Sequence, residues 1–384
     1  MSKEIICLST NGVCQSTSRQ APVLLLIATI DGAAMYERAD ANAPWRQTDR
    51  VLKGLPVSSL AYEPKSGNLI AGLHYQGGIR VSTDGGKSWE TRNNGLKSGH
   101  VYTLAIQYVR DSTIIYAGTE PAEVYRSEDF GRNWRALAPL NNVRDSDKWL
   151  FPHAVPHAKN IAFHPSMPET LYVCVEQGDL LRSDDAGQSW YQLDGFDQPG
   201  NKFRRDVHRV TVVPSDASRF YLTSGDGLYF ATNGGKTWTQ LTGPTFRLGY
   251  PDPFFLHPKN ETICFMAGAC RNPSPWWGET GTAIPAFMRS TDSGHTWAER
   301  MGGLPNPVPG NIEAAALHTS ESGLEFFIGT ARGALYTSRD EGASWELISN
   351  DLPPISKGPH FRHFLPREQR TAVEDQLRAI NAFV

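Results

Sequence analysis

The sequence contains no apolar run that approaches the ~20 residues needed to cross a bilayer as a helix. It also lacks a strong excess of charge of either sign, since 37 basic residues face 40 acidic ones and leave a net charge of −3. A broad electrostatic surface for nucleic acid or for an anionic membrane is therefore not expected. We predict neither a nucleic-acid partner nor a membrane partner.

Cysteine is scarce, and the five cysteines show neither metal-ligand spacing nor an even number for pairing. They are Cys7, Cys14, Cys174, Cys264 and Cys270. The first ten residues also lack a long apolar stretch followed by a small-residue cleavage site. These absences predict mostly buried thiols and a cytoplasmic location.

What the sequence has in abundance is a repeat that ends in tryptophan. Six copies read close to Ser-x-Asp-x-Gly-x-Ser/Thr-Trp, and they end at Trp89, Trp134, Trp190, Trp238, Trp297 and Trp345. A decayed first copy keeps only Asp40 and Trp45. The copies recur about every 50 residues, which is the period of four-stranded sheets that stack radially beside one another.

Each copy lies between two apolar runs, so it is typical of a hairpin turn. In the first complete copy, the Ser82 and Asp84 side chains are expected to bind backbone amides of the turn. Gly86 supplies the residue with positive φ. Trp89 then begins the next strand and is expected to bury its ring between adjacent sheets.

These copies resemble the Asp-box, or BNR repeat, of sialidase-like, xyloglucanase-like and sortilin-like propellers, and the resemblance spans roughly residues 20 to 350. It implies an all-β fold, a seven-bladed β-propeller of four-stranded antiparallel blades, with the boxes on outer hairpins far from the ligand-binding axis. We expect the propeller at residues 1–355 and a tail at 356–384. Residues 366–383 of the tail are expected to form a short helix that packs on the propeller or joins two copies as a homodimer.

The alignment of the repeats also predicts individual strands. Innermost strands are expected at residues 57–62, 101–106, 158–163, 207–212, 254–256 and 312–317. Residues 4–9 are the candidate innermost strand of the first blade, which would place the chain ends near the join of the first and last blades. Three insertions, at 138–157, 193–206 and 270–285, are expected on the binding face.

The aligned repeats place polar residues in columns at one end of the axis. The residues just before the innermost strands are Pro56, His100, His157, Asp206, Tyr250 and Asn311. Two positions further on are Ser58, Tyr102, Lys159, His208, Asp252 and Glu313. The loops after the second strands contribute Asp31, His74, Glu120, Glu176, Asp226, Arg271 and Arg332. Deeper positions are apolar, so the sequence predicts a polar mouth over an apolar floor.

Imidazoles and carboxylates that converge on an axis fit two kinds of chemistry. One divalent ion of Zn, Mn or Fe would take ligands from His74, His100, His157, His208 and Glu176. Without a metal, His157 or His208 would be the general base and Glu120 or Glu313 the acid, with Tyr102 as a further catalytic candidate. A third alternative is that these groups only pair with one another across a wide channel.

Candidate substrate-binding residues stand near the same mouth. Lys159, Arg271 and Arg332 would bind a carboxylate or phosphate, or else form ordinary ion pairs. Trp276, with Trp277, would cover a ring or a sugar, or else only fix its loop, and Tyr250 lines the mouth.

The repeat alone does not predict sialidase activity. The Phe/Tyr-Arg-Ile-Pro segment of sialidases is missing, because Phe203-Arg204, Phe246-Arg247 and Phe361-Arg362 are followed by other residues. Similar seven-bladed xyloglucan hydrolases place their acids between two propellers, whereas one propeller is predicted here. Two hypotheses follow: a cytoplasmic hydrolase or lyase acting on a small polar or acidic substrate in the axial funnel, or a non-catalytic binding or assembly module.

Overall fold

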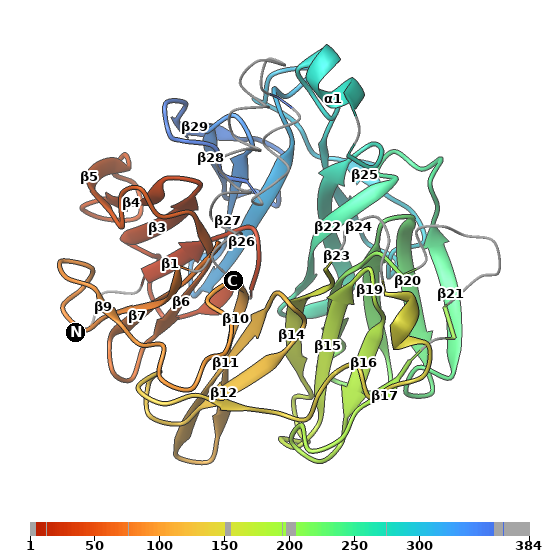
Figure 1. Cartoon of the computed structure of the whole chain (residues 1–384). Coiled ribbons are helices and arrows are strands. Elements are labelled where there is room, and N and C mark those ends of the chain that lie inside the picture. Colours follow the sequence, from red (N-terminus) through yellow and green to blue (C-terminus); the bar gives the residue numbers. More distant parts are fainter. Residues whose placement is uncertain are drawn as a thin grey trace.

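The structure is a computed structural model that describes residues 5–12, 14–75, 77–149, 155–193, 195–196, 205–273, 275–356 and 364. Seven sheets stand around a common centre in chain order, so the last sheet adjoins the first (Figure 1). Six sheets have four strands and the seventh has five. The predicted all-β, seven-bladed propeller is confirmed.

Each sheet is one blade, and its strands run outward from the axis in chain order. Blades 1 to 3 are β1 (Ile5–Leu8), β3 (Leu24–Thr29), β4 (Gly32–Glu37) and β5 (Arg46–Val51); β6 (Val57–Glu63), β7 (Asn68–Leu73), β8 (Gly78–Ser82) and β9 (Glu90–Thr91); and β10 (Val101–Val109), β11 (Ser112–Thr119), β12 (Val124–Ser127) and β13 (Arg135–Ala136). Blades 4 and 5 are β14 (His157–Phe163), β15 (Leu171–Glu176), β16 (Leu180–Ser183) and β17 (Tyr191–Gln192); and β18 (Val207–Val212), β19 (Phe220–Ser224), β20 (Gly227–Thr232) and β21 (Thr237–Thr242). Blades 6 and 7 are β22 (Tyr250–His257), β23 (Asn260–Ala269), β24 (Ala286–Ser290) and β25 (Ala298–Glu299); and β26 (Ile312–Ser320), β27 (Gly323–Thr330), β28 (Leu335–Ser338) and β29 (Glu346–Ser349), with β2 (Gln15–Thr17) added.

The hydrophobic core lies between the blades. Every residue of β7 is buried, because a second strand has a neighbouring blade against each face. Between blades 2 and 3, Ile70 and Ile79 pack with Leu104 and the ring of Trp134. The outer strand β5 is mostly exposed instead. This burial explains why the inner and second strands are nearly continuous apolar runs in the sequence.

The Asp-box hairpins have the predicted geometry. The Asp84 carboxylate accepts the Ser88 amide at 2.9 Å and the Ser88 hydroxyl at 2.6 Å. The Gly86 amide donates to Ser82 Oγ at 2.8 Å, and Gly86 has a φ of 94°. Trp134, Trp190 and Trp345 bury their rings and donate their indole N–H groups to carbonyls of the preceding repeat.

Hydrogen bonds within the boxes predict a stability loss at low pH. Donors such as Ser88, Ser189 and Thr296 lower the pKa values of Asp84, Asp185 and Asp292 to about 2. Because these pKa values are depressed on folding, the stabilisation is complete above about pH 4 and is lost as the pH falls through 2. We expect the difference in melting temperature between wild type and Asp84→Asn to shrink from pH 5 to pH 2. A difference that does not change with pH would contradict this assignment.

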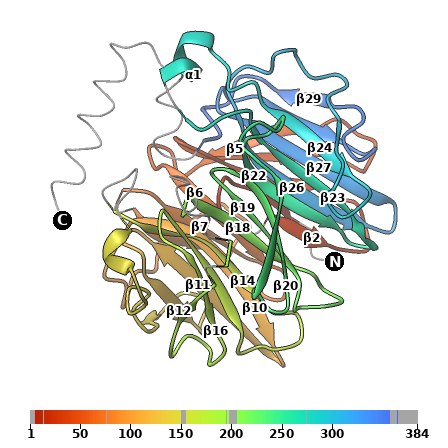
Figure 2. The same cartoon turned by 90° about the vertical axis from the view of Figure 1, so that its right-hand side faces the viewer.

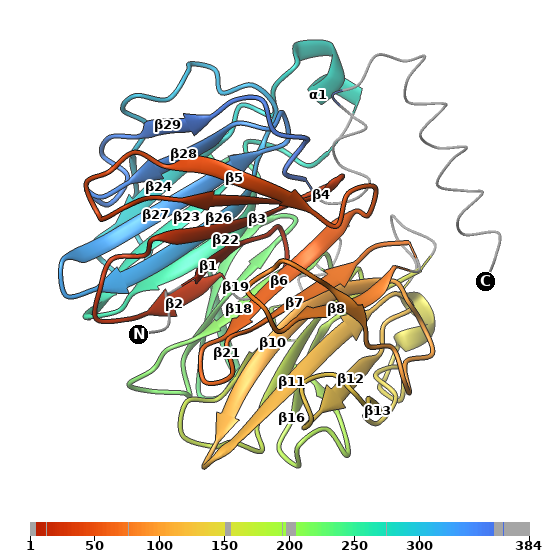
Figure 3. The same cartoon turned by 90° about the vertical axis from the view of Figure 1, so that its left-hand side faces the viewer.

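The N-terminal strands close the ring in an unexpected way. The predicted innermost strand of blade 1 is confirmed, but β1 pairs with β3 in parallel. β2 then crosses to blade 7 and pairs in parallel with β26 (Figure 3). The same join carries a buried ion pair, in which the Arg38 guanidinium donates to both oxygens of Glu325 at 2.9 and 2.7 Å.

The segment between β1 and β2 crosses the axis. Asn11 bridges to Ser59 of blade 2, and Arg209 of blade 5 donates to the Gly12 carbonyl at 2.7 Å. Gly12 has a φ of 84°, and a Cβ there would lie 2.4 Å from the Ser59 hydroxyl. The deeper apolar column is buried as expected, and Asn11 and Gly12 add polar backbone contacts with blades 2 and 5 that the sequence did not predict.

Other sequence predictions have mixed outcomes. All five cysteines are free thiols, four of them buried, as predicted. Two insertions contribute the short helices η1 (Ser146–Lys148) and α1 (Pro275–Thr280), which lie toward the same side of the propeller (Figure 2). Most of the 193–206 insertion and the predicted helix at 366–383 lie outside the described residues. Within the described ranges, no helix is both long and apolar enough to cross a bilayer.

Candidate functional site

A recurring β-bulge builds the axial site. In six blades, the pairing register between the innermost and second strands shifts near the second residue of the strand. A bulge leaves its extra residue outside the ladder and redirects the side chain. The residues at these bulges are Ser58, Tyr102, Lys159, His208, Asp252 and Glu313, and all of them are buried. They are the same residues that the repeat alignment placed in one column.

Three histidines and a glutamate form a connected group over blades 2 to 4. His74 Nδ1 lies 3.0 Å from His100 Nε2, and His100 Nδ1 lies 3.2 Å from a Glu120 oxygen. The other Glu120 oxygen is 3.5 Å from His157 Nδ1. The three imidazoles are almost fully buried, whereas the Glu120 side chain is 22% exposed. Glu120 is therefore the member of this group that a ligand in the mouth can reach.

Tyr102 fixes the orientation of this group. Its ring stacks on the His157 ring, with 3.7 Å between centroids and 19° between planes. It also meets the His74 ring edge-on at 4.9 Å. Burial raises the pKa of Tyr102 well above its usual range, so the phenol stays neutral.

The hydrogen bonds determine the protonation of the group. Burial alone would raise the pKa of Glu120, but donors from His100 and His157 outweigh it and lower that pKa well below its usual range. Burial also opposes protonation of His157, yet its bonds to Glu120 and Glu176 raise its pKa above the usual value. Burial lowers the pKa of His74 instead. These shifts favour the anionic form of Glu120, the protonated form of His157 and the neutral form of His74.

A buried lysine continues the network toward blades 4 to 6. Glu176 Oε2 lies 2.9 Å from His157 Nε2 and 2.8 Å from Lys159 Nζ. The same ammonium is 3.3 Å from Asp252. Burial opposes protonation of Lys159, but Asp252 and Glu176 outweigh it and raise its pKa. Predicted acidic-substrate binding by Lys159 would have to compete with these two carboxylates.

The five predicted metal ligands do not gather around one point. Among the described residues, the compact set of potential ligands is Glu176, Asp206 and His208, whose ligand atoms lie within 4.8 Å of one another. Carboxylate and imidazole donors suit Zn, Mn or Fe. The Lys159 ammonium already neutralises part of this set, and His208 Nδ1 lies 2.6 Å from the Pro251 carbonyl. The bound metal stays a prediction.

Other candidates face the chain's own C-terminal tail. Glu313 accepts a hydrogen bond from Ser356 at 2.8 Å, and Arg332 donates to the Phe364 carbonyl at 3.1 Å. Trp277, rather than Trp276, is the fully buried anchor of its loop. The exposed Arg271 lies over the Trp276 ring at 6.0 Å from its centroid.

Sequence reasoning gave no role to Asp206 and Asp252, although both stand in its polar columns. Their signal in the sequence was the column position. Asp206 pairs with His208 two residues further along the same blade, whereas the pairing of Asp252 with Lys159 depends on a contact between blades. Tyr250, which we predicted to bind substrate, lies edge-on to His208 at 4.6 Å between centroids. Tyr250 therefore lines the mouth beside His208.

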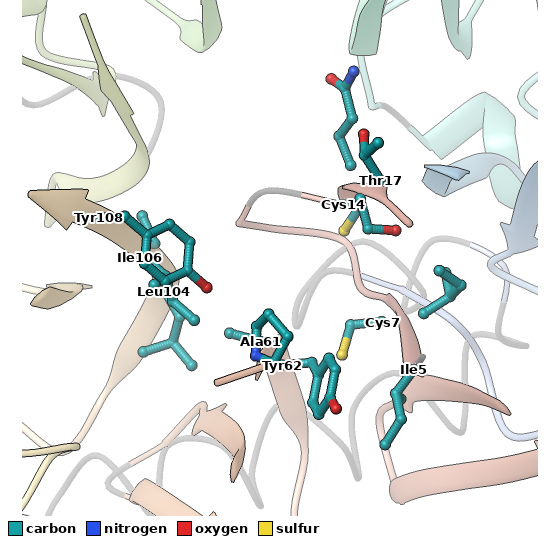
Figure 4. A pocket seen from close by; sticks show the side chains of 14 residues that line it. Ile5, Cys7, Cys14, Thr17, Ala61, Tyr62, Leu104, Ile106 and Tyr108 are labelled. Carbon is teal, nitrogen blue, oxygen red and sulfur yellow. The ribbon is translucent and has the colours of Figure 1, made fainter. Parts of the chain in front are cut away.

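A separate cavity of about 270 Å³ lies at the opposite end of the inner strands. Its lining includes Cys7, Cys14, Tyr62, Leu104 and Tyr108 (Figure 4). None of its described lining residues carries a charged side chain.

The boxes and the seven radially arranged sheets define the class of this chain as an Asp-box, or BNR-repeat, β-propeller. The BNR/Asp-box repeat matches residues 80–91. A xyloglucanase from Paenibacillus sp. is 26% identical over 311 residues, which cover 71% of this chain and 28% of the relative. The xyloglucanase Xgh74A of Acetivibrio thermocellus is 26% identical over 322 residues, covering 68% and 36%. The matches thus span about a third or less of the length of these curated relatives.

Solved structures agree on the fold. A GH74 enzyme from Niastella koreensis has a TM-score of 0.60 at 18% identity, and the match covers 85% of this chain and 52% of that one. YCF48 bound to a D1 peptide has a TM-score of 0.55 at 18% identity, covering 85% and 93%. Identities this low support the propeller fold alone.

These relatives correct the functional hypothesis. Five curated relatives are xyloglucanases, which favours a hydrolase. The prediction of a cytoplasmic hydrolase or lyase for a small polar or acidic substrate is therefore wrong, since xyloglucan is a polymer. The non-catalytic binding or assembly alternative is not favoured either. Cytoplasmic location, taken by itself, stays a prediction, as does the state of monomer or homodimer.

Proposed function

We propose that this propeller is a glycoside hydrolase that cleaves a polysaccharide of the xyloglucan type at its axial mouth. The observation that carries the proposal is the similarity to xyloglucanases over 71% of the chain. The described residues form one propeller, so a cleft between two propellers is not available within them. The acid–base groups would have to come from the mouth.

The mouth offers an accessible carboxylate for glycosidic hydrolysis. Such enzymes need a proton donor for the leaving oxygen and a base or nucleophile on the other side of the bond. Glu120 is the accessible carboxylate, and its ionised form suits the base or nucleophile. His157 positions Glu120 rather than reaching the substrate, because its ring is buried, both of its ring nitrogens face carboxylates (Glu120 and Glu176), and Tyr102 stacks on it.

Incubation of the purified protein with xyloglucan tests the proposal directly. We expect new reducing ends to appear, and analysis of the products by chromatography would show whether cleavage occurs within the chain or at its end. Cellulose and xylan serve as comparison polymers. Absence of cleavage of all three polymers by the folded protein would refute the proposal. Repeating the assay after chelation with EDTA and after adding Zn²⁺ or Mn²⁺ would test the predicted metal separately.

A further inference from the structure

Three buried side chains of the mouth come together where blades 4 and 5 meet. They are Glu176 at the end of β15, Asp206 just before β18 and His208 within β18. An isolated backbone bridge joins Glu176 to Asp206, so the main chain holds these two residues side by side. Gly225 makes room for Asp206, because a Cβ at Gly225 would lie 2.3 Å from a carboxylate oxygen. The ligand atoms of the three side chains lie within 4.8 Å of one another.

The backbone also sets the tautomer of His208. Its Nδ1 lies 2.6 Å from the Pro251 carbonyl oxygen, which can only accept, so Nδ1 carries the proton. The imidazole is fully buried, and its Nε2 has no hydrogen-bond partner among the described residues. Tyr250 meets the ring edge-on at 4.6 Å between centroids and limits its rotation. A histidine that binds a metal has this arrangement, with one nitrogen bonded to a carbonyl and the other directed at the ion.

The spacing of the side chains fits one small divalent ion. His208 Nε2 lies 3.4 Å from Asp206 Oδ1. Ligand atoms about 2.1 Å from a tetrahedral Zn²⁺ lie roughly 3.4 Å apart, so one ion can contact both atoms at ordinary bond lengths. Glu176 belongs to the same compact set, and rotation of its carboxylate toward the ion would complete three protein ligands. The fourth position would stay open for water.

The buried Lys159 ammonium is the cation that would compete with a metal. It lies 2.8 Å from Glu176 Oε2 and 3.3 Å from Asp252. His157 Nε2 contacts the same Glu176 oxygen at 2.9 Å. Two donors use both lone pairs of Oε2, so Glu176 would bind a metal through Oε1. Lys159 and His157 would then hold the carboxylate in place, as outer hydrogen-bond partners do in metal sites.

We propose that Glu176, Asp206 and His208 form a binding site for one Zn²⁺ ion. Two carboxylates and one imidazole are ligands that Zn²⁺ accepts in proteins. The site differs from the ligand set expected from the sequence, because it takes Asp206 as a ligand and leaves out the histidines of blades 2 to 4. It does not depend on the proposed glycan hydrolysis.

Zn²⁺ binding to the full-length protein tests the site. The protein is first freed of metal with EDTA and dialysed, and Zn²⁺ is then titrated in competition with a chromogenic chelator. We expect wild type to bind one Zn²⁺ per chain. Asp206→Asn keeps the shape of the side chain but removes an anionic ligand, so it should weaken Zn²⁺ binding at least ten-fold.

A second histidine–carboxylate pair supplies the matched control. His257 Nε2 lies 3.7 Å from Glu341 Oε1, but this pair is partly exposed and belongs to blades 6 and 7. His257→Gln should therefore keep the wild-type affinity for Zn²⁺. The proposal is overturned if wild type binds less than one ion per chain, if Asp206→Asn binds Zn²⁺ as tightly as wild type, or if His257→Gln loses as much affinity as Asp206→Asn.

Wild type alone gives further readouts in case Asp206→Asn fails to fold. An ion that binds only the folded state stabilises it, so stoichiometric Zn²⁺ should raise the melting temperature of wild type. Co²⁺ in place of Zn²⁺ should give the strong visible absorption of a tetrahedral site. An unchanged melting temperature, or the weak absorption of octahedral Co²⁺, would count against the proposal. None of these measurements follows glycan cleavage, so failure of the hydrolase proposal would leave them intact.

Discussion

Replacing Glu325 with alanine is expected to lower the free energy of unfolding by about 3–5 kcal/mol. The Glu325 side chain is 6% exposed and that of Arg38 is fully buried, so the substitution leaves a guanidinium charge without its bidentate partner. The pair joins β27 of blade 7 to the residue that follows β4 in blade 1, and the Arg38 guanidinium also lies 4.3 Å from the Trp45 ring centroid. Denaturant unfolding followed by far-UV circular dichroism measures the change.

The chain offers a matched control at the same join. Arg19 and Glu321 also connect the N-terminal segment to blade 7, at 3.2 Å, but their side chains are 89% and 72% exposed. Water screens such a pair, so Glu321→Ala should change stability little. Equal losses for Glu321→Ala and Glu325→Ala would show that the buried pair has no special part in closing the ring.

Replacing Glu120 with glutamine is expected to reduce the proposed hydrolysis by about 10²–10⁴-fold. The amide keeps the shape of the side chain but removes the negative charge, so it cannot act as base or nucleophile. It also removes the charge that faces His100 and His157. Initial rates on xyloglucan, with the amount of folded protein fixed by circular dichroism, measure the effect.

A distant carboxylate supplies the control for Glu120. Glu346 is exposed on the outer strand β29, and Glu346→Gln should keep the wild-type rate. If Glu120→Gln retains more than a tenth of the wild-type activity, the acid–base group lies elsewhere and the role of Glu120 is refuted. Loss of activity in both variants would indicate a fault in folding rather than in chemistry.

The architecture was predictable because local sequence patterns determine it. Serine, aspartate and glycine at fixed spacing specify a hairpin whose side-chain bonds lie within a few residues, as in the contacts between Ser82, Asp84 and Ser88. Aligning these hairpins also located the polar columns, including His74, Glu120 and His157. The number of blades and the order of the strands followed from the count of repeats.

Contacts between distant segments were not predictable. β2 has only three residues and no apolar pattern, so nothing in its sequence indicates pairing with β26. Glu313 was expected to be catalytic, but its bond to Ser356 depends on the path of the tail. The anchoring role of Trp277 was not predictable for a similar reason, since its ring packs against Phe364, which is distant in the sequence.

The polar segment that crosses beneath the mouth has a mechanical consequence. Arg209 of blade 5 holds the Gly12 carbonyl, and Asn11 lies against Ser59 of blade 2, so this segment spans the centre of the ring between these two blades. A polymer that passed along the axis would have to displace this segment. A long glycan would instead have to lie across the mouth, with a single glycosidic bond placed near the axis.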